Sequence, residues 1–252
     1  MSFHVAAEAY DRFMGRYSEP LADRLLERAG VRAGQRALDV GCGPGAVTTR
    51  LAAVLGPDRV AAVDPSEPFV AAVRERCPGV DVRLGVAEEL PHEPAAFDVV
   101  VAQLVVHFMN DPVRGLAEMR RVVRPDGVLA ASVWDFGGDR APLSTFWRAA
   151  RELDPEVAGE SSLPGAREGQ LAGLAAEAGW RDVRAVDATV SVAYGSVEEW
   201  WEPYTFGVGP AGDLVARLGG DGRAALRRRC AELLPEPPFT VTATAWIVVA
   251  RG

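Results

Sequence analysis

A run of three closely spaced glycines is the feature of this sequence whose residue types and spacing could do chemistry. Gly41, Gly43 and Gly45 lie in LDVGCGPG (38–45), after a run of apolar residues and before a segment with helical periodicity. A backbone without side chains can turn tightly and approach a ligand closely, and the N–H groups that start the next helix can face the same place. The spacing therefore predicts a ligand-binding loop between a strand and a helix.

An aspartate follows the next predicted strand. The run RVAAV (59–63) is largely apolar, and Asp64 stands directly after it. A carboxylate at the end of such a strand can accept hydrogen bonds from two neighbouring ribose hydroxyls. Ser66 is the better-placed cap for the helix that follows. We therefore expect Asp64, with Pro65 and Ser66 beside it, to bind the sugar of a nucleoside.

The glycine loop also resembles that of a known family. VGCGPG (40–45), preceded by Asp39 inside the strand, resembles the first motif of class I S-adenosylmethionine-dependent methyltransferases, whose loop wraps the methionine part of the cofactor. The run YDRFMGRY (10–17) resembles the lid helix of the ubiquinone and menaquinone biosynthesis methyltransferases. The resemblance implies S-adenosylmethionine as cofactor and methyl transfer to an oxygen, nitrogen or carbon of a small-molecule acceptor, such as a secondary metabolite or a quinone-like compound.

Two other functions remain open from the sequence. Gly41, Gly43 and Ala46 also fit the dinucleotide-binding pattern G-x-G-x-x-G/A, which would indicate an NAD(P)-dependent oxidoreductase. The position of Gly45 after a proline, and of Asp39 within the strand, both favour the methyltransferase. A protein that binds S-adenosylmethionine but has an altered, non-methylating activity would keep the same loop.

The resemblance assigns further cofactor-binding residues. The segment GVAEELP (85–91) resembles the stretch that cradles adenine, but Val86 stands where many relatives have an aspartate. The expected polar contacts therefore pass to the backbone of Ala87 and the carboxylate of Glu88. Arg16 could pair with the carboxylate of the cofactor. The expected cofactor-binding residues are Arg16, Asp39, Gly41, Cys42, Gly43, Gly45, Asp64, Pro65, Ser66, Ala87, Glu88 and Gln103.

The candidate acceptor side follows the fourth predicted strand. AQLVVHF (102–108) occupies the stretch that in the family lines the floor between methionine and acceptor. Gln103 either contacts a ligand or only starts the next helix. His107 is the candidate catalytic residue, a general base for an acceptor hydroxyl, with a structural role as the alternative. The candidate acceptor-binding residues, which could instead serve packing, are Tyr10, Tyr17, Trp200, Trp201 and Tyr204.

A parallel sheet is needed to bring these residues together. Short apolar runs alternate with amphipathic segments from about residue 20 to residue 134, which is typical of an α/β fold with helices on both faces of the sheet. With the resemblance, we expect a Rossmann-like class I methyltransferase fold: a mainly parallel seven-stranded sheet with an antiparallel C-terminal strand and a helical cap. The expected strands are 36–40, 59–63, 80–84, 97–103, 127–134, 183–193 and 239–250, and the expected helices include 20–29, 46–55, 111–123, 142–153 and 168–178.

The expected organisation is a single methyltransferase domain over residues 1–252. The segment 194–238 is too long for a structureless loop, so we expect two or three helices there, over the carboxyl ends of the sheet. The expected parts are lid helices in 1–30, a cofactor-binding core in 31–134, and cap insertions in 135–165 and 194–238.

Composition excludes several classes of protein. The net charge of −8 disfavours nucleic acid as a partner, and no apolar run is long enough to cross a bilayer. All 27 residues counted as lysine or arginine are arginines, which excludes a Schiff-base lysine and the lysine of a P-loop. Cys42, Cys77 and Cys230 suit neither a disulfide framework nor a zinc site. We expect a cytoplasmic protein that acts on a small molecule, without a metal ion and in an undefined oligomeric state.

Overall fold

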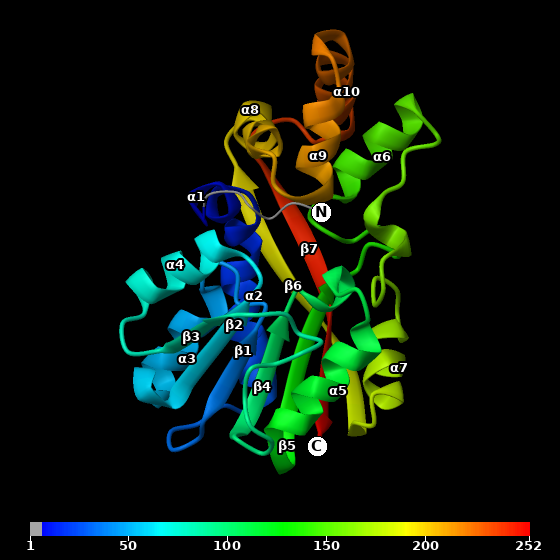
Figure 1. Ribbon diagram of the computed structural model, residues 1–252. Helices are drawn as coiled ribbons and strands as arrows, with labels where there is room; N and C mark the ends of the chain where they lie inside the picture. The colour runs from blue at the N-terminus through cyan, green and yellow to red at the C-terminus, as the bar shows by residue number, and fades with distance from the viewer. Residues whose placement is uncertain (1–6) are drawn as a thin grey trace.

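A seven-stranded sheet forms the centre of the computed structural model, which describes residues 7–252 (Figure 1). The strand order is β3-β2-β1-β4-β5-β7-β6, and within these residues β7 is antiparallel to both of its neighbours while the other pairs are parallel. This arrangement confirms the expected Rossmann-like class I methyltransferase fold. The strands are β1 (Ala37–Val40), β2 (Val60–Asp64), β3 (Asp81–Leu84), β4 (Phe97–Gln103), β5 (Val123–Trp134), β6 (Arg181–Tyr194) and β7 (Phe239–Arg251).

Helices cover both faces of the sheet. In β4, Val99 and Val101 pack into one buried cluster with α2 and α3, whereas Val100 and Ala102 pack into another with α5 and α7. Because both faces are buried, the central strands read as continuous apolar runs rather than as an alternating pattern. The covering helices are α2 (Arg16–Ala29), α3 (Ala46–Leu55), α4 (Glu67–Arg76), α5 (Pro112–Val122) and α7 (Gln170–Glu177).

The first helical region begins earlier than the sequence indicated. We expected a helix at 20–29 with Pro20 in its first turn, but Pro20 lies inside α2, which follows directly on α1 (Ala7–Tyr10) and a π-helical turn η1 (Asp11–Gly15). Proline removes the hydrogen bond to the carbonyl four residues earlier, and that carbonyl belongs to the first residue of α2. Packing of a buried apolar stripe on the sheet outweighs this loss. Residues 1–6 of the expected lid lie outside the described residues.

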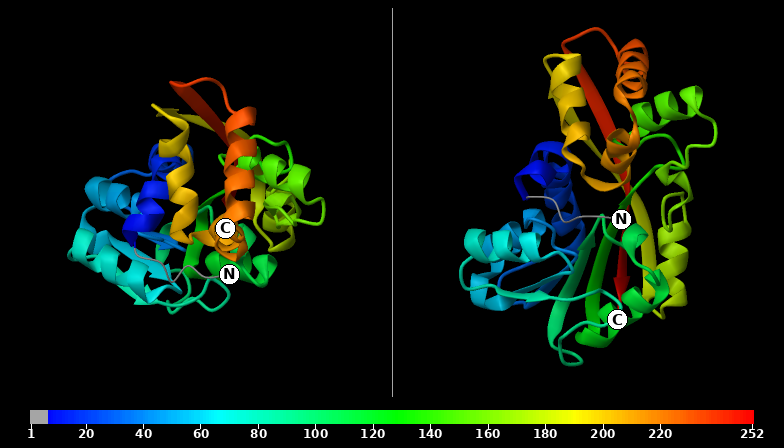
Figure 2. Two further views of the ribbon diagram at one scale, coloured as in Figure 1. Left: turned by 90° about the horizontal axis from the view of Figure 1, so that it is seen from above. Right: turned by 45° about the horizontal axis from the view of Figure 1, so that its top comes forward.

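The cap extends the sheet at one end. β7 pairs with β5 only from Ala245 onward, whereas its earlier residues pair with β6 alone, so the two strands project beyond the rest of the sheet as a ribbon. The segment that joins them follows the carboxyl end of β6 and lies at the far end of this ribbon (Figure 2). The elements of this segment are α8 (Val197–Trp201), η5 (Glu202–Phe206), α9 (Gly209–Arg217) and α10 (Gly220–Leu233). The helix α6 (Ser144–Leu153), from earlier in the chain, packs against α10.

The cysteines of this chain form no cross-link among the described residues. Cys42, Cys77 and Cys230 are all buried and free. No group of three or more histidine, cysteine or acidic residues among residues 7–252 could hold a metal ion. Over the same residues, no helix has both the length and the apolar character that crossing a membrane requires.

Candidate active site

The glycine loop lies at the carboxyl end of β1, which pairs with β2 on one side and with β4 on the other. Gly41, Gly43 and Gly45 have φ angles of 69°, 53° and 103°, in the left-handed region that favours glycine. A Cβ atom on Gly41 would lie 2.3 Å from Cγ2 of Val105, just after β4. Residue 41 must therefore be glycine for the loop to approach the end of β4. Open α/β sheets bind their ligands outside the carboxyl ends of the strands where the strand order reverses, which in this sheet is between β1 and β4.

The backbone N–H groups of this loop are tied to the protein itself. Gly41 and Cys42 both donate to the carbonyl of Val63, at 2.7 and 3.1 Å, and Gly43 donates to Oδ2 of Asp64 at 2.8 Å. The sequence predicted that main-chain N–H groups at this loop would face a ligand. The three N–H groups of residues 41–43 instead donate to acceptors of β2. A phosphate would need free donors at this place, whereas a cationic ligand would not. The loop therefore offers close approach of the backbone without an anion-binding nest.

Asp64 points toward the glycine loop. Its Oδ2 accepts the hydrogen bond from Gly43, and its Oδ1 accepts one from the backbone N–H of Ser66 at 2.8 Å. Burial raises the pKa of Asp64, and the two backbone hydrogen bonds act in the opposite direction. Each carboxylate oxygen can accept more than one hydrogen bond, so the group can also take the two hydroxyls of a ribose.

Asp39 lies behind the loop rather than on its open side. It is buried in β1, and its Oδ2 accepts a 2.6 Å hydrogen bond from Oγ1 of Thr48 in α3. Burial raises the pKa of Asp39 to about 7, although the hydrogen bonds from Thr48 lower it. Asp39 thus joins β1 to the first turn of α3. Together with Asp64 it gives the loop an acidic environment that a cation would stabilise.

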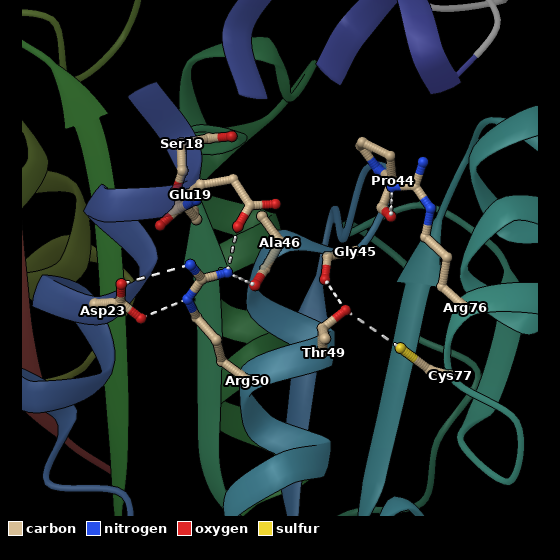
Figure 3. A network of polar contacts seen from close by, with 11 residues as sticks. Ser18, Glu19, Asp23, Pro44, Gly45, Ala46, Thr49, Arg50, Arg76 and Cys77 are labelled. Atoms are coloured by element: carbon tan, nitrogen blue, oxygen red, sulfur yellow. Dashed lines mark hydrogen bonds and ion pairs between the residues drawn. The ribbon is translucent and has the colours of Figure 1, made fainter. Parts of the chain in front are cut away.

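Two arginines hold the glycine loop and α3 in place from either side (Figure 3). Arg50 in α3 donates to Oδ1 of Asp23 in α2 at 2.5 Å. On the other side, Arg76 in α4 donates to the carbonyl of Pro44 at 2.9 Å and pairs with Asp11 at 2.6 Å. The loop is therefore fixed relative to α2, α4 and the N-terminal turn η1.

A hollow, which we call the loop cleft, opens beside the glycine loop. It brings together seven of the residues expected from the sequence, which are Tyr10, Gly41, Gly43, Asp64, Pro65, Ala87 and Gln103. Gly85 and Val86 come from the expected adenine segment 85–91, and Leu104, Val105 and Phe108 come from the expected floor segment 102–108, although none of the five was singled out as a binding residue. The sequence did not predict Val63, Phe69, Met109 and Asn110 at this place. Phe69 has a weak signal in the sequence, because it starts the apolar face of the helix after Asp64.

Six expected cofactor residues lie outside the lining of the loop cleft. Arg16 pairs with Glu199 of α8 at 2.5 Å and stacks over the ring of Tyr194 at 4.5 Å. Oε1 of Glu88 accepts from the backbone N–H of Asn110 at 2.8 Å. These contacts position the surrounding segments. The six residues are Arg16, Asp39, Cys42, Gly45, Ser66 and Glu88.

Gln103, at the end of β4, lines the loop cleft and has a buried acceptor without a partner among the described residues. Its Nε2 donates to the carbonyl of Ser18 in α2 at 2.9 Å, which fixes the amide. Its Oε1 is buried and has no hydrogen-bond partner among the described residues. A buried acceptor without a partner is costly unless a ligand supplies the donor. The acceptor, together with the two nearby carboxylates, fits a cationic nucleoside such as S-adenosylmethionine, which carries an ammonium and a sulfonium.

A second, much smaller hollow adjoins the loop cleft, and we call it the apolar chamber. Tyr10, Leu104 and Phe108 line both hollows. Leu104 has a φ of 59°, which is unusual for a residue other than glycine, and such strain is often found at functional sites. The other residues that line the chamber are Phe13, Met14, His107, Trp134, Phe136, Leu143, Glu160, Val208, Gly209, Pro210 and Ala211.

His107 lies on the wall of the apolar chamber, in the short 3-10 helix η3 (Val106–Phe108). It is buried, and its Nδ1 has no hydrogen-bond partner among the described residues. Burial lowers the pKa of His107 to about 3. The imidazole is therefore neutral near pH 7 and would be a weak base.

Four of the expected acceptor-binding aromatics pack outside both hollows. The hydroxyl of Tyr17 is 2.8 Å from that of Tyr194, and the ring of Tyr204 stacks on Phe146 with centroids 4.6 Å apart. Both contacts belong to the buried region between α2, α6 and the cap. The four residues are Tyr17, Trp200, Trp201 and Tyr204, whereas Tyr10 lines the cleft and the chamber.

A comparison with known sequences identifies the family. A family model described as a methyltransferase domain matches residues 38–131. The malonyl-[acyl-carrier protein] O-methyltransferase of Salmonella typhimurium is 32% identical over 172 residues, which are 66% of this chain and 67% of that protein. An uncharacterized methyltransferase of Mycobacterium tuberculosis is 37% identical, over 56% of this chain and 54% of that protein. Nocamycin O-methyltransferase of Saccharothrix syringae is 38% identical, over 50% and 48%.

Solved structures agree with this fold. A phosphoethanolamine N-methyltransferase of Haemonchus contortus superposes with a TM-score of 0.61 at 18% identity, over 97% of this chain and 57% of that chain. The [4+2]-cyclase SpnF superposes with a TM-score of 0.57 at 24% identity, over 92% and 80%. The chain belongs to the class I S-adenosylmethionine-dependent methyltransferases. It spans about half the length, or less, of several curated relatives that it matches.

Proposed function

We propose that this chain transfers a methyl group from S-adenosylmethionine to an oxygen, nitrogen or carbon of a small-molecule acceptor, such as a secondary metabolite or a quinone-like compound. One observation carries the proposal: the loop cleft and the apolar chamber meet at Tyr10, Leu104 and Phe108. A cofactor in the cleft and an acceptor in the chamber would thus lie in neighbouring spaces. The names of two relatives, both O-methyltransferases, support an oxygen as the acceptor atom.

The protein residues would bind and orient the two ligands. Asp64 would accept hydrogen bonds from the ribose hydroxyls, and Oε1 of Gln103 would accept one from the ammonium group. S-adenosylmethionine, when bound, supplies an electrophilic methyl group. The apolar walls of the chamber would exclude water and hold the acceptor close, which are the main contributions that such a transfer needs from a protein.

The two alternative functions differ from this proposal in what they bind and release. An NAD(P)-dependent oxidoreductase would need loop N–H groups for the pyrophosphate, and those of Gly41, Cys42 and Gly43 are engaged with β2. A non-methylating protein would bind the cofactor and leave its methyl group in place. The weak basicity of His107 is compatible with that alternative, and the fold is shared with a cyclase.

Calorimetry and a labelled-methyl assay test the proposal together. We expect S-adenosylhomocysteine to bind and NAD not to bind, and binding of NAD alone would overturn the proposal. Transfer of label from methyl-labelled S-adenosylmethionine would then be measured over a set of phenols, amines and quinols. Binding of S-adenosylhomocysteine without label transfer to any of them would favour the non-methylating alternative.

A further inference from the structure

A buried glutamate lies on the wall of the apolar chamber. Glu160 begins the short 3-10 helix η4 (Glu160–Ser162), and only 4% of its surface is exposed. Its Oε2 accepts a 2.7 Å hydrogen bond from Nε1 of Trp147 in α6, and no ion pair to it forms among the described residues. Burial raises the pKa of Glu160 to about 7, and the hydrogen bond from Trp147 acts in the opposite direction. The carboxyl group thus retains accepting capacity without a protein cation to neutralise it.

The rest of the chamber wall offers no positive charge. Among the described residues that line it, none is an arginine, and the chain contains no lysine. The ionisable groups on the wall besides Glu160 are Tyr10 and His107, and burial keeps His107 neutral near pH 7. An acceptor that carries a carboxylate or phosphate would therefore meet a buried acid without any compensating cation, which is strongly unfavourable.

The outer side of Glu160 has charged neighbours of both signs. Glu160 and Pro210 also line a groove on the other side of η4, and this groove includes Asp154, Glu156 and Asp213 with the single arginine Arg217. Outside the chamber, the guanidinium of Arg151 lies against Gly159, the residue before Glu160. The groove and its surroundings therefore have acidic and basic side chains, whereas Glu160 is the acid that also lines the chamber.

We propose that Glu160 determines the specificity of the chamber, by accepting a hydrogen bond from a hydroxyl group on an apolar, aromatic acceptor and by excluding acceptors with an anionic group. This inference rests on the proposed function only in calling the occupant an acceptor. The apolar lining, with Phe108, Trp134 and Phe136, matches an aromatic body, and the one buried carboxylate matches its hydroxyl. Glu160 is thereby an acceptor-binding residue on the wall of the chamber.

The test uses two probes that differ in one group, 2-naphthol and 2-naphthoate. Their binding to the full chain saturated with S-adenosylhomocysteine would be measured at about pH 8, above the pKa of about 7 of Glu160. The indole N–H resonance of Trp147 reports on occupancy directly, because that group donates to Glu160. The variants are Glu160→Gln and, as a matched control, Glu156→Gln, which removes the same charge from an exposed position four residues away.

We expect 2-naphthol to bind, to shift the Trp147 resonance, and to bind the wild type at least about tenfold more tightly than 2-naphthoate. Glu160→Gln should weaken the binding of 2-naphthol by about tenfold and reduce the ratio of the affinities for 2-naphthol and 2-naphthoate. Glu156→Gln should change neither the affinity for 2-naphthol nor that ratio. Equal or tighter binding of naphthoate, an unchanged affinity for naphthol in Glu160→Gln, or no binding of either probe would overturn the inference. If Glu160→Gln does not fold, the affinities of the wild type for 2-naphthol and 2-naphthoate still test the inference.

Failure of this inference can be told apart from failure of the proposed function. Binding of S-adenosylhomocysteine and transfer of labelled methyl test the proposed function, and neither readout depends on the naphthyl probes. If S-adenosylhomocysteine does not bind, the proposed function fails, and the Trp147 resonance still reports whether the chamber selects naphthol. If S-adenosylhomocysteine binds and naphthoate is preferred, only the inference about Glu160 fails.

Discussion

The loop cleft and the apolar chamber adjoin each other but are built in different ways. The cleft combines a fixed backbone at the glycine loop with the carboxylate of Asp64 and the free acceptor of Gln103. The chamber is walled by apolar and aromatic side chains, with Glu160 as its charged group among the described residues. The cleft therefore depends on backbone conformation and hydrogen bonds, whereas the chamber depends on side-chain shape and on the absence of cations.

The difference also concerns where the residues come from. The cleft is made mostly from loops that directly follow β1, β2, β3 and β4. The chamber draws on the N-terminal turn, η3, the end of β5, η4 and α9, which are far apart in the sequence. The conformation of a loop at the end of a strand is constrained by the position of that strand in the sheet. The separate segments around the chamber can accept substitutions independently of one another. Substitutions should therefore be tolerated less in the cleft than in the chamber.

The largest effect is expected for Gly41→Ala. The new Cβ would clash with Val105, and an alanine at residue 41 would have to adopt a left-handed φ. We therefore expect a loss of about 3 to 4 kcal/mol in the free energy of unfolding. Urea unfolding measures this. Gly43→Ala is the matched control, because it has a positive φ but no atom within 4 Å of its Cβ, and should cost about 1 kcal/mol. Similar losses for the two variants would contradict the close approach at residue 41.

The next largest effect is expected for Asp64→Asn. Removing the charge while keeping the shape should weaken binding of S-adenosylhomocysteine by about 100-fold, since two charge-assisted hydrogen bonds to the ribose are replaced or lost. Calorimetry measures this, with the exposed Asp58→Asn as control. Binding of 2-naphthol in the chamber, measured without S-adenosylhomocysteine, should be unchanged. An affinity for S-adenosylhomocysteine within threefold or so of the wild type would rule out the ribose role.

A pH dependence with opposite signs should separate two residues of the chamber. The pKa of Glu160 is raised from 4.5 to about 7, so its neutral form is favoured in the folded state, and its contribution to stability falls as the pH rises from about 4.5 to about 7. The pKa of His107 is lowered from 6.5 to about 3, so its contribution is full above about pH 6.5 and is lost as the pH falls toward about 3.

Variants of these residues reveal the two contributions. Relative to the wild type, the free energy of unfolding of Glu160→Gln should rise by roughly 2 kcal/mol between pH 4.5 and 7, and that of His107→Phe should fall over the same interval. Chemical unfolding at a series of pH values measures both trends. Parallel curves for a variant and the wild type would show that the corresponding group titrates normally.

The smallest effect is expected for Leu143→Met in the chamber wall. Leu143 is buried, and methionine has a similar volume and more flexibility, so we expect a loss of less than about 1 kcal/mol in the free energy of unfolding. Binding of S-adenosylhomocysteine should be unchanged by calorimetry. A loss as large as that of Gly41→Ala would show that the chamber is as constrained as the cleft.

The sheet and the glycine loop could be predicted from the sequence because their signals are local. All seven strands form where apolar runs occur, with ends that shift by a few residues, and Asp64 directly follows the apolar run 59–63, which places it at the carboxyl edge of the sheet, where it contacts Gly43. The partner of Arg16 could not be predicted, because Glu199 lies 183 residues away. The same holds for Glu160, which lies in a Gly/Ser/Pro-rich link, and only the folded chain brings it to Trp147.

Because Tyr10 is shared by the two hollows, we expect their occupancies to depend on each other. Tyr10 ends α1, packs edge-on against Phe69 with ring centroids 5.4 Å apart, and forms part of both walls. A ligand that fixes this ring from one side prepares the surface for a ligand on the other, so each should raise the affinity of the other by the same factor. Cooperative, reciprocal loading would then follow from a single shared side chain, without any movement of the sheet.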